Sequence, residues 1–320
     1  MVPHTLPRCN VKLIENCDLI GKVSAITSLP EQSPTAQAKA IPWSAIGWFS
    51  ALLILVYFPT LEHLVIQWST DEDVGHGFFV PIVAGYIVWQ RRADLLALEW
   101  KPNWWGLALM AWGILQSVVG MLGVELFLQR SSILITLVGM LLLLGGTAVV
   151  RTLLFPLLLL PFMIPIPAVI FNQITFPLQL FASRVAESIL NVLNIPVLRD
   201  GNVLELASQK LSVAEACSGI RSLLSLSFLS LVYAYFFDKK VWMRWALLVG
   251  VFPIAILANA ARVTITAILS EEVNPELAHG FFHTFEGWVI FLIAFVMLLA
   301  LHAATNRVYK SLRRPVSPAS

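Results

Sequence analysis

The chain has 320 residues, of which 58% are apolar and only 12% are charged. A soluble domain carries about 25% charged residues, so this composition excludes a soluble enzyme and indicates a polytopic membrane protein. The net charge of +2 is too small to indicate a nucleic-acid partner, and no basic patch with interleaved aromatic residues occurs.

In chain order, residues 1–42 are predicted to form a flexible cytoplasmic tail, because they are polar and lack the apolar core of a signal peptide or a span. Residues 43–305 form the membrane domain, and 306–320 form a basic cytoplasmic tail. The fold class is therefore all-α. Uninterrupted apolar runs predict eight transmembrane helices, at about 43–61, 76–90, 104–124, 131–149, 153–170, 222–237, 243–263 and 286–304.

Segment 175–194 is also apolar, but polar residues recur along it at helical spacing. Such a polar stripe predicts a helix that lies in the membrane interface instead of crossing the bilayer. A ninth span here is the alternative, and it would reverse the topology of everything that follows. The stripe consists of Gln179, Ser183, Glu187, Asn191 and Asn194.

The distribution of basic residues orients the eight spans. With the N-terminus inside, the inner loops and the C-terminal tail hold eleven Lys and Arg residues, and the outer loops hold four. This is the positive-inside bias, so both termini are expected in the cytoplasm. The loops 195–221 and 270–285 then face outward, and the first of them has the alternation expected of a short β-hairpin.

Cys217 is the first candidate functional residue. The chain has three cysteines, and the other two, Cys9 and Cys17, lie in the N-terminal tail, across the membrane in this topology. A lone thiol at the start of an apolar helix is a candidate nucleophile, because the positive end of the helix dipole favours the thiolate. Arg221, one turn later, acts in the same direction, whereas Glu215 acts in the opposite direction, so the sequence does not determine the net effect on the thiol. The alternative is that Cys217 is a small buried apolar residue.

Arg262 and a group of histidines complete the candidate site. Arg262 lies in an apolar helix on the same face as Asn259, and an ionisable group at membrane depth marks function by default, although an arginine that snorkels to headgroups is the alternative. His283 can transfer a proton near neutral pH, and Glu286, three residues later, could orient its ring. His279 and His76 compete for this role, and a structural histidine is the alternative for each.

A metal site is the obvious competitor for a set of Cys and His residues. No CxxC, HExxH or other ligand spacing occurs, so no metal and no cofactor are expected. A phosphate-binding glycine loop and a GxSxG nucleophile elbow are also absent from the sequence.

Four segments together resemble the motifs of the exosortase family. They are Ala216-Cys217-Ser218-Gly219-Ile220-Arg221-Ser222, then Asn259-Ala260-Ala261-Arg262-Val263, then His283-Thr284-Phe285-Glu286-Gly287-Trp288, and the N-terminal His76-Gly77-Phe78-Phe79-Val80-Pro81. They occur in the family order, and the resemblance covers about residues 43–305.

The resemblance implies a membrane-embedded cysteine transpeptidase. Its partners would be exported proteins whose C-terminal sorting signal combines a Pro-Glu-Pro (PEP-CTERM) motif, one transmembrane helix and a basic tail. It implies Cys217 as the nucleophile, Arg262 as the oxyanion or substrate-positioning group and His283 as the acid/base, with Arg221 and Asn259 in support. It also implies the bacterial inner membrane, with the site on the extracytoplasmic face, and a link to exopolysaccharide production. It assigns no role to His76 and identifies no acceptor nucleophile.

A second hypothesis, from another class, is a transporter or assembly factor for envelope polysaccharide. Prolines at 156, 161, 165 and 167 would break the fifth predicted helix, as happens in helices that line transport paths. The absence of an internal repeat and the scarcity of charges at mid-membrane depth oppose this hypothesis.

Overall fold

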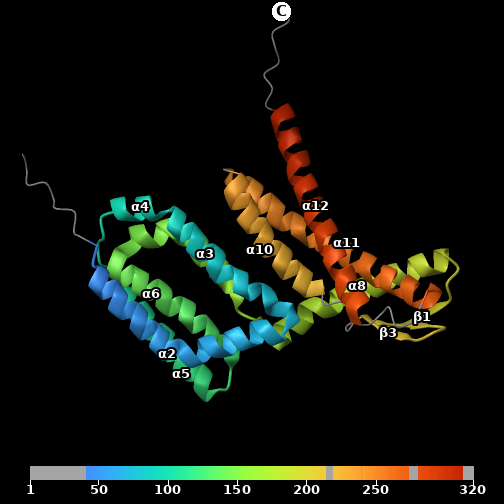
Figure 1. The fold of residues 1–320 in the computed structure, drawn as a ribbon, viewed down its shortest axis with the longest axis horizontal. Coiled ribbons are helices and arrows are strands. Elements are labelled where there is room, and N and C mark those ends of the chain that lie inside the picture. Colours follow the sequence, from blue (N-terminus) through green and yellow to red (C-terminus); the bar gives the residue numbers. More distant parts are fainter. Residues whose placement is uncertain (1–40, 214–218, 239, 274–279, 313–320) are drawn as a thin grey trace, which may run out of the picture. The chain divides into compact units, whose positions relative to one another are not determined.

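The computed structural model describes residues 41–213, 219–238, 240–273 and 280–312, and it is built almost entirely of helices (Figure 1). The chain first forms α2 (Trp43–Thr70), η1 (Glu72–Phe78), α3 (Phe79–Gln90), α4 (Arg92–Ala97), α5 (Trp105–Leu122), α6 (Leu126–Thr152), α7 (Leu154–Leu159) and η2 (Leu160–Met163). It continues with α8 (Ala168–Val192), β1 (Val197–Asp200), β2 (Val203–Leu206), β3 (Lys210–Ser212), α10 (Gly219–Phe237), α11 (Val241–Glu272) and α12 (Gly280–Leu312).

The all-α membrane class is confirmed, but the count of eight transmembrane helices is wrong. Within the described ranges, five helices are long and apolar enough to cross a bilayer, namely α2, α5, α6, α11 and α12, and a bent pair raises the number to six. The predicted span 76–90 is the 12-residue α3 preceded by a 3₁₀ helix, about 18 Å of α-helix against a hydrocarbon core of about 30 Å. The predicted span 222–237 is likewise a shorter apolar helix.

The predicted fifth span is broken at its prolines. Helix α7 and η2 end at Met163, and α8 begins after Pro167 with its axis bent by 83° from theirs. Proline removes a backbone donor and clashes with the preceding turn, so a run with four prolines cannot continue as one straight helix. Residues 168–170, expected in the fifth span, therefore belong to α8 together with the segment expected in the interface.

The polar stripe of α8 contacts protein. Ser183 Oγ donates to the Gly201 carbonyl at 3.1 Å, and the Asn202 amide donates to Gln179 Oε1 at 3.0 Å. The Arg199 guanidinium pairs with Glu187 at 2.6 Å. These three side chains of α8 therefore dock the β1–β2 hairpin, which explains why polar residues recur at helical spacing in an apolar segment.

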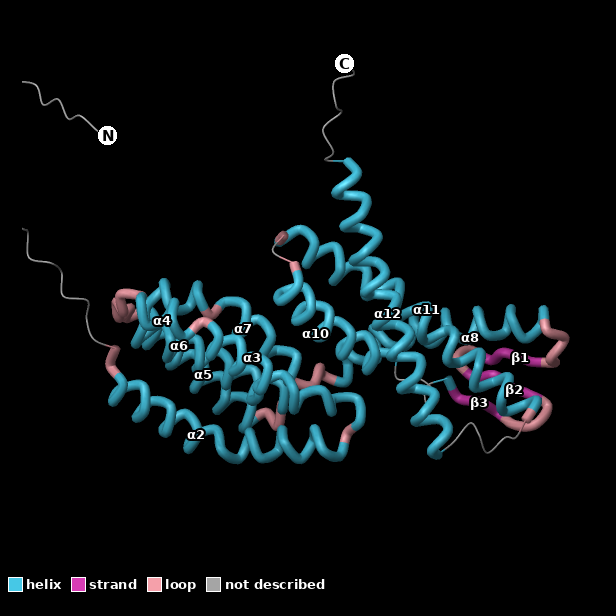
Figure 2. Tube along the Cα trace, turned by 45° about the horizontal axis from the view of Figure 1, so that its top comes forward, coloured by secondary structure: helices cyan, strands magenta, loops and turns pink. Residues whose placement is uncertain are grey.

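The expected hairpin is present and gains a third strand (Figure 2). Strand β1 pairs antiparallel with β2 in the register Val197↔Leu206, and β2 pairs with β3 in the register Leu204↔Leu211. Gly201 turns the hairpin with φ +62°, a backbone conformation that glycine adopts without strain. The inner face of the sheet is apolar and packs against α8 and α11, where the buried residues include Ala186, Leu190, Leu204, Leu211, Ala260 and Val263.

Two further buried clusters hold the helices that carry the motifs. One joins α10, α11 and α12 through residues such as Leu226, Leu247, Val251 and Leu298. The other joins α2, α3, α6, α7 and η1, and Phe228 of α10 belongs to it as well. Helix α10 therefore packs against both groups, and its first turn lies next to η1.

Candidate active site

Arg262 lies in the second half of α11. Its neighbours in sequence, Ala260 and Val263, belong to the buried cluster that packs against the sheet. Arg262 itself is half-buried. Small residues around it let neighbouring elements approach closely. The guanidinium therefore lies among packed helices, in the part of α11 that contacts α12.

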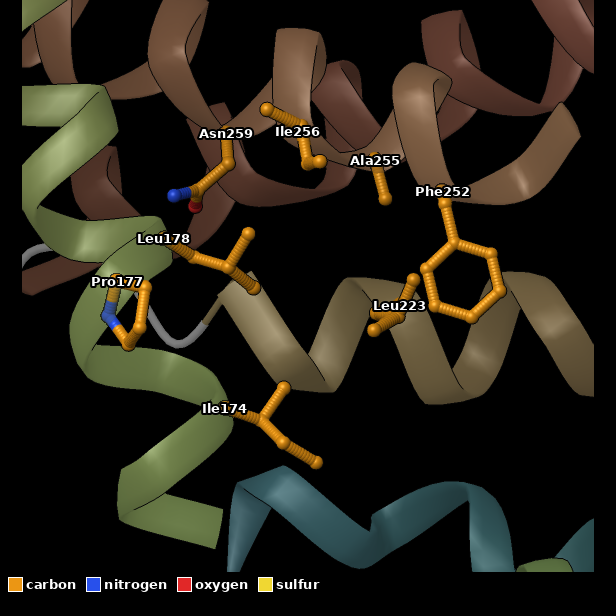
Figure 3. A pocket seen from close by; sticks show the side chains of 8 residues that line it. All are labelled: Ile174, Pro177, Leu178, Leu223, Phe252, Ala255, Ile256 and Asn259. Carbon is orange, nitrogen blue, oxygen red and sulfur yellow. The ribbon is translucent and has the colours of Figure 1, made fainter. Parts of the chain in front are cut away.

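Asn259, three residues before Arg262, is buried and lines an apolar hollow of about 120 Å³ (Figure 3). The other lining side chains are apolar and come from α8, α10 and α11, namely Ile174, Pro177, Leu178, Leu223, Phe252, Ala255 and Ile256. Asn259 is the sole amide in this lining. The predicted supporting residue Asn259 therefore places its amide at a hollow that Leu223, near the start of α10, also lines.

Arg221 is oriented by a carboxylate that the sequence did not assign to it. Its Nε donates to Oδ1 of Asp73 at 2.9 Å, across 148 residues of chain. Asp73 is itself fixed, because its backbone N–H donates to Oδ1 of Asp71 at 2.9 Å. The acidic run just before His76 was the available signal, but a sequence alone does not say which cation such a run contacts.

His76 lies on the same 3₁₀ helix as Asp73 and is held to η2. Its Nε2–H donates to the Phe162 carbonyl at 3.1 Å, which assigns the proton of the neutral ring to that nitrogen. Burial lowers the pKa of His76, and the hydrogen bond with Phe162 opposes this in part. His76 therefore holds η1 against η2, and η1 also carries Asp73, the residue that orients Arg221.

The third motif, on α12, packs directly against Arg262. A Cβ added to Gly287 would lie 3.2 Å from Nη2 of Arg262, so this glycine allows the guanidinium to rest against the helix backbone. The spacing predicted that Glu286 orients the ring of His283, whose side chain lies outside the described part of the structure. Oε2 of Glu286 accepts a hydrogen bond of 2.8 Å from Thr266 Oγ1 on α11.

Two of the predicted residues lie outside the described part of the chain. These are Cys217 and His279, and for His283 the backbone at the start of α12 is described but the side chain is not. Cys217 falls in the short segment between Val213, buried in the core beneath the sheet, and Gly219, the first residue of α10. Val213 before the cysteine motif shares a buried cluster with residues of α11, and α10 after the motif packs against α11.

Comparison with known families assigns the chain. The model of the family described as Transmembrane exosortase matches residues 68–300, which is well over half of the chain. The chain belongs to the exosortase family. The match includes all four motif segments, so the resemblance drawn from those motifs is confirmed at the level of the family. No curated protein and no solved structure matched this exosortase.

Proposed function

We propose that this exosortase is a membrane-embedded cysteine transpeptidase that cleaves C-terminal sorting signals of exported proteins. The observation that carries the proposal is the contact between Arg262 and Gly287, which joins the arginine motif on α11 to the histidine motif on α12. The Asp73–Arg221 pair adds support, because it fixes the first turn of the helix that follows the cysteine motif.

The mechanism begins with the Cys217 thiolate. Its sulfur attacks the scissile carbonyl carbon, and the π electrons move onto the carbonyl oxygen, where the Arg262 guanidinium stabilises the negative charge. When the intermediate collapses, the C–N bond breaks and the departing amine takes a proton from the protonated His283. The exported protein is left as a thioester on Cys217.

The second half of the reaction releases that protein. An acceptor amine or water attacks the thioester carbonyl, neutral His283 removes its proton, and the C–S bond breaks to return the thiolate. In this proposal the substrate's transmembrane helix reaches the site from the bilayer, and the positive-inside bias supports a reaction at the extracytoplasmic face of a bacterial inner membrane. Arg221 and Asn259 support the nucleophile and the oxyanion group in this scheme.

The decisive experiment replaces the nucleophile. A protein with a Pro-Glu-Pro sorting signal is co-expressed with the wild type, with Cys217→Ala and with Cys17→Ala as a matched cysteine control. Cys217→Ala should abolish the mobility shift that marks cleavage, and Cys17→Ala should process like the wild type at equal membrane abundance. Full processing by Cys217→Ala would exclude the thiol mechanism and favour a transporter or assembly factor, which does not need the thiol.

A further inference from the structure

Glu286 is held in place by a threonine of the neighbouring helix. Thr266 is 1% exposed, and its Oγ1 donates to Oε2 of Glu286 at 2.8 Å. Buried threonines in helices commonly bond a backbone carbonyl one turn back, as Thr264 does with Ala260 at 2.8 Å. Thr266 instead bonds a side chain of α12, so this hydroxyl fixes the direction of a carboxylate.

The second oxygen of that carboxylate is available as an acceptor. Oε1 of Glu286 is buried and makes no hydrogen bond within the described ranges. Arg262 is a cation beside this part of α12, because its guanidinium lies against Gly287, the residue that follows Glu286. Arg262 lies four residues before Thr266, one helical turn away on the same face of α11.

Gly287 sets the position of the guanidinium from the other side. A Cβ there would lie 3.2 Å from Nη2 and 3.3 Å from Cζ of Arg262, closer than ordinary van der Waals contact. Arg262 therefore rests on bare backbone, next to a carboxylate whose direction is fixed. A planar guanidinium held on two sides keeps one orientation, which a group that stabilises developing charge requires.

We propose that Thr266 and Glu286 are positioning residues for Arg262, with Gly287 as the surface against which the guanidinium is set. Thr266 holds the carboxylate, the carboxylate draws the guanidinium toward α12, and the missing Cβ of Gly287 lets it settle there. The inference rests on the proposed function and deepens it, because Arg262 is the oxyanion group in that reaction.

The test compares two buried threonines of α11 in a cleavage assay with a sorting-signal protein. Thr266→Val keeps the shape but removes the donor, so we expect kcat to fall about 10-fold with KM unchanged, since misplacement of a group that acts in the transition state lowers kcat. Thr264→Val removes a buried hydroxyl that donates to the Ala260 carbonyl within α11, and it should stay within about 2-fold of the wild type. Thr266→Ser retains the hydroxyl and should restore most of the rate.

A double-mutant cycle separates positioning from general damage. Gly287→Ala pushes the guanidinium away by its Cβ and should also lower kcat. If both changes act through Arg262, Thr266→Val should reduce the rate of Gly287→Ala by much less than it reduces that of the wild type. Equal reductions in both backgrounds, or a Thr266→Val rate that matches Thr264→Val, would overturn the positioning role. A wild type that cleaves no sorting signal would contradict the proposed function instead.

Discussion

At the scale of single residues, the ion pair between Arg221 and Asp73 has a modest energetic value. The two side chains are 36% and 29% exposed, and pairs of this kind contribute at most about 1 kcal/mol to stability. The pair also joins two elements that are distant in the sequence. Helix η1 directly follows the first candidate span, and α10 directly follows Cys217 and Ser218 of the cysteine motif. The main effect of the ion pair is therefore to direct a guanidinium and to fix the start of α10.

We expect Asp73→Asn to slow sorting-signal cleavage several-fold with little change in thermal stability, because it removes the charge that orients Arg221. The measurement is the cleavage rate at matched membrane abundance, together with the midpoint of thermal unfolding in detergent. Glu187→Gln is the control, since it breaks an ion pair of similar exposure with Arg199 that lies on α8 and the sheet. Equal cleavage by Asp73→Asn and Glu187→Gln would show that the reaction does not depend on the Asp73 carboxylate.

At the scale of elements, α10, α11 and α12 are tied together at the end opposite to the motifs. His302 of α12 is buried, and its Nε2 lies 3.1 Å from Oδ2 of Asp238 in the α10–α11 connection, while its Nδ1 lies 2.9 Å from the Tyr233 hydroxyl. Lys240 extends the group through its backbone N–H to Asp238 and its ammonium to Asn306. A polar network buried in this way holds the helix ends in register.

Loss of the central histidine should loosen these helices. We expect His302→Ala to cost about 2–4 kcal/mol, because it leaves a cavity and removes a partner from the buried Asp238 carboxylate. The expected result is a lower thermal midpoint in detergent and lower membrane abundance. His63→Ala, which truncates an exposed histidine of α2, is the control. An unchanged midpoint for His302→Ala would mean that the network does not stabilise the helix ends.

At the scale of the whole molecule, charge separates the two ends of the α11–α12 pair. Lys240 and Arg244 begin α11, and Glu271 and Glu272 end it beside the sheet. The basic end is the end retained in the cytoplasm under the positive-inside rule. The sheet and the Arg262 region are then expected on the extracytoplasmic side, whatever the number of spans before them.

Labelling with a membrane-impermeant maleimide tests this topology. Ala207→Cys, in the exposed connection between β2 and β3, should react in intact cells on a background that lacks the native cysteines. Ser311→Cys, near the end of α12, should react only after the membrane is breached. The reverse pattern would place the site in the cytoplasm and exclude a role in processing exported proteins after their export.

The sequence determined the membrane class and the family because both depend on local properties. Apolar runs of sufficient length read as spans at α2, α5, α6, α11 and α12, and the four motifs are contiguous stretches that identify the family without reference to packing. The hairpin was predictable for the same reason, since alternation and a turn glycine are features of neighbouring residues.

The tertiary structure alone decided the length of the short helices and the partners of the polar residues. The apolar run at 76–90 does not reveal that its first part forms a 3₁₀ helix held to η2 by His76. No spacing in the sequence links Glu286 to Thr266, which lies on another helix and donates a hydrogen bond to its Oε2. Arg221 and Asp73 are 148 residues apart, and a contact over that distance is set by how helices pack, which no local pattern contains.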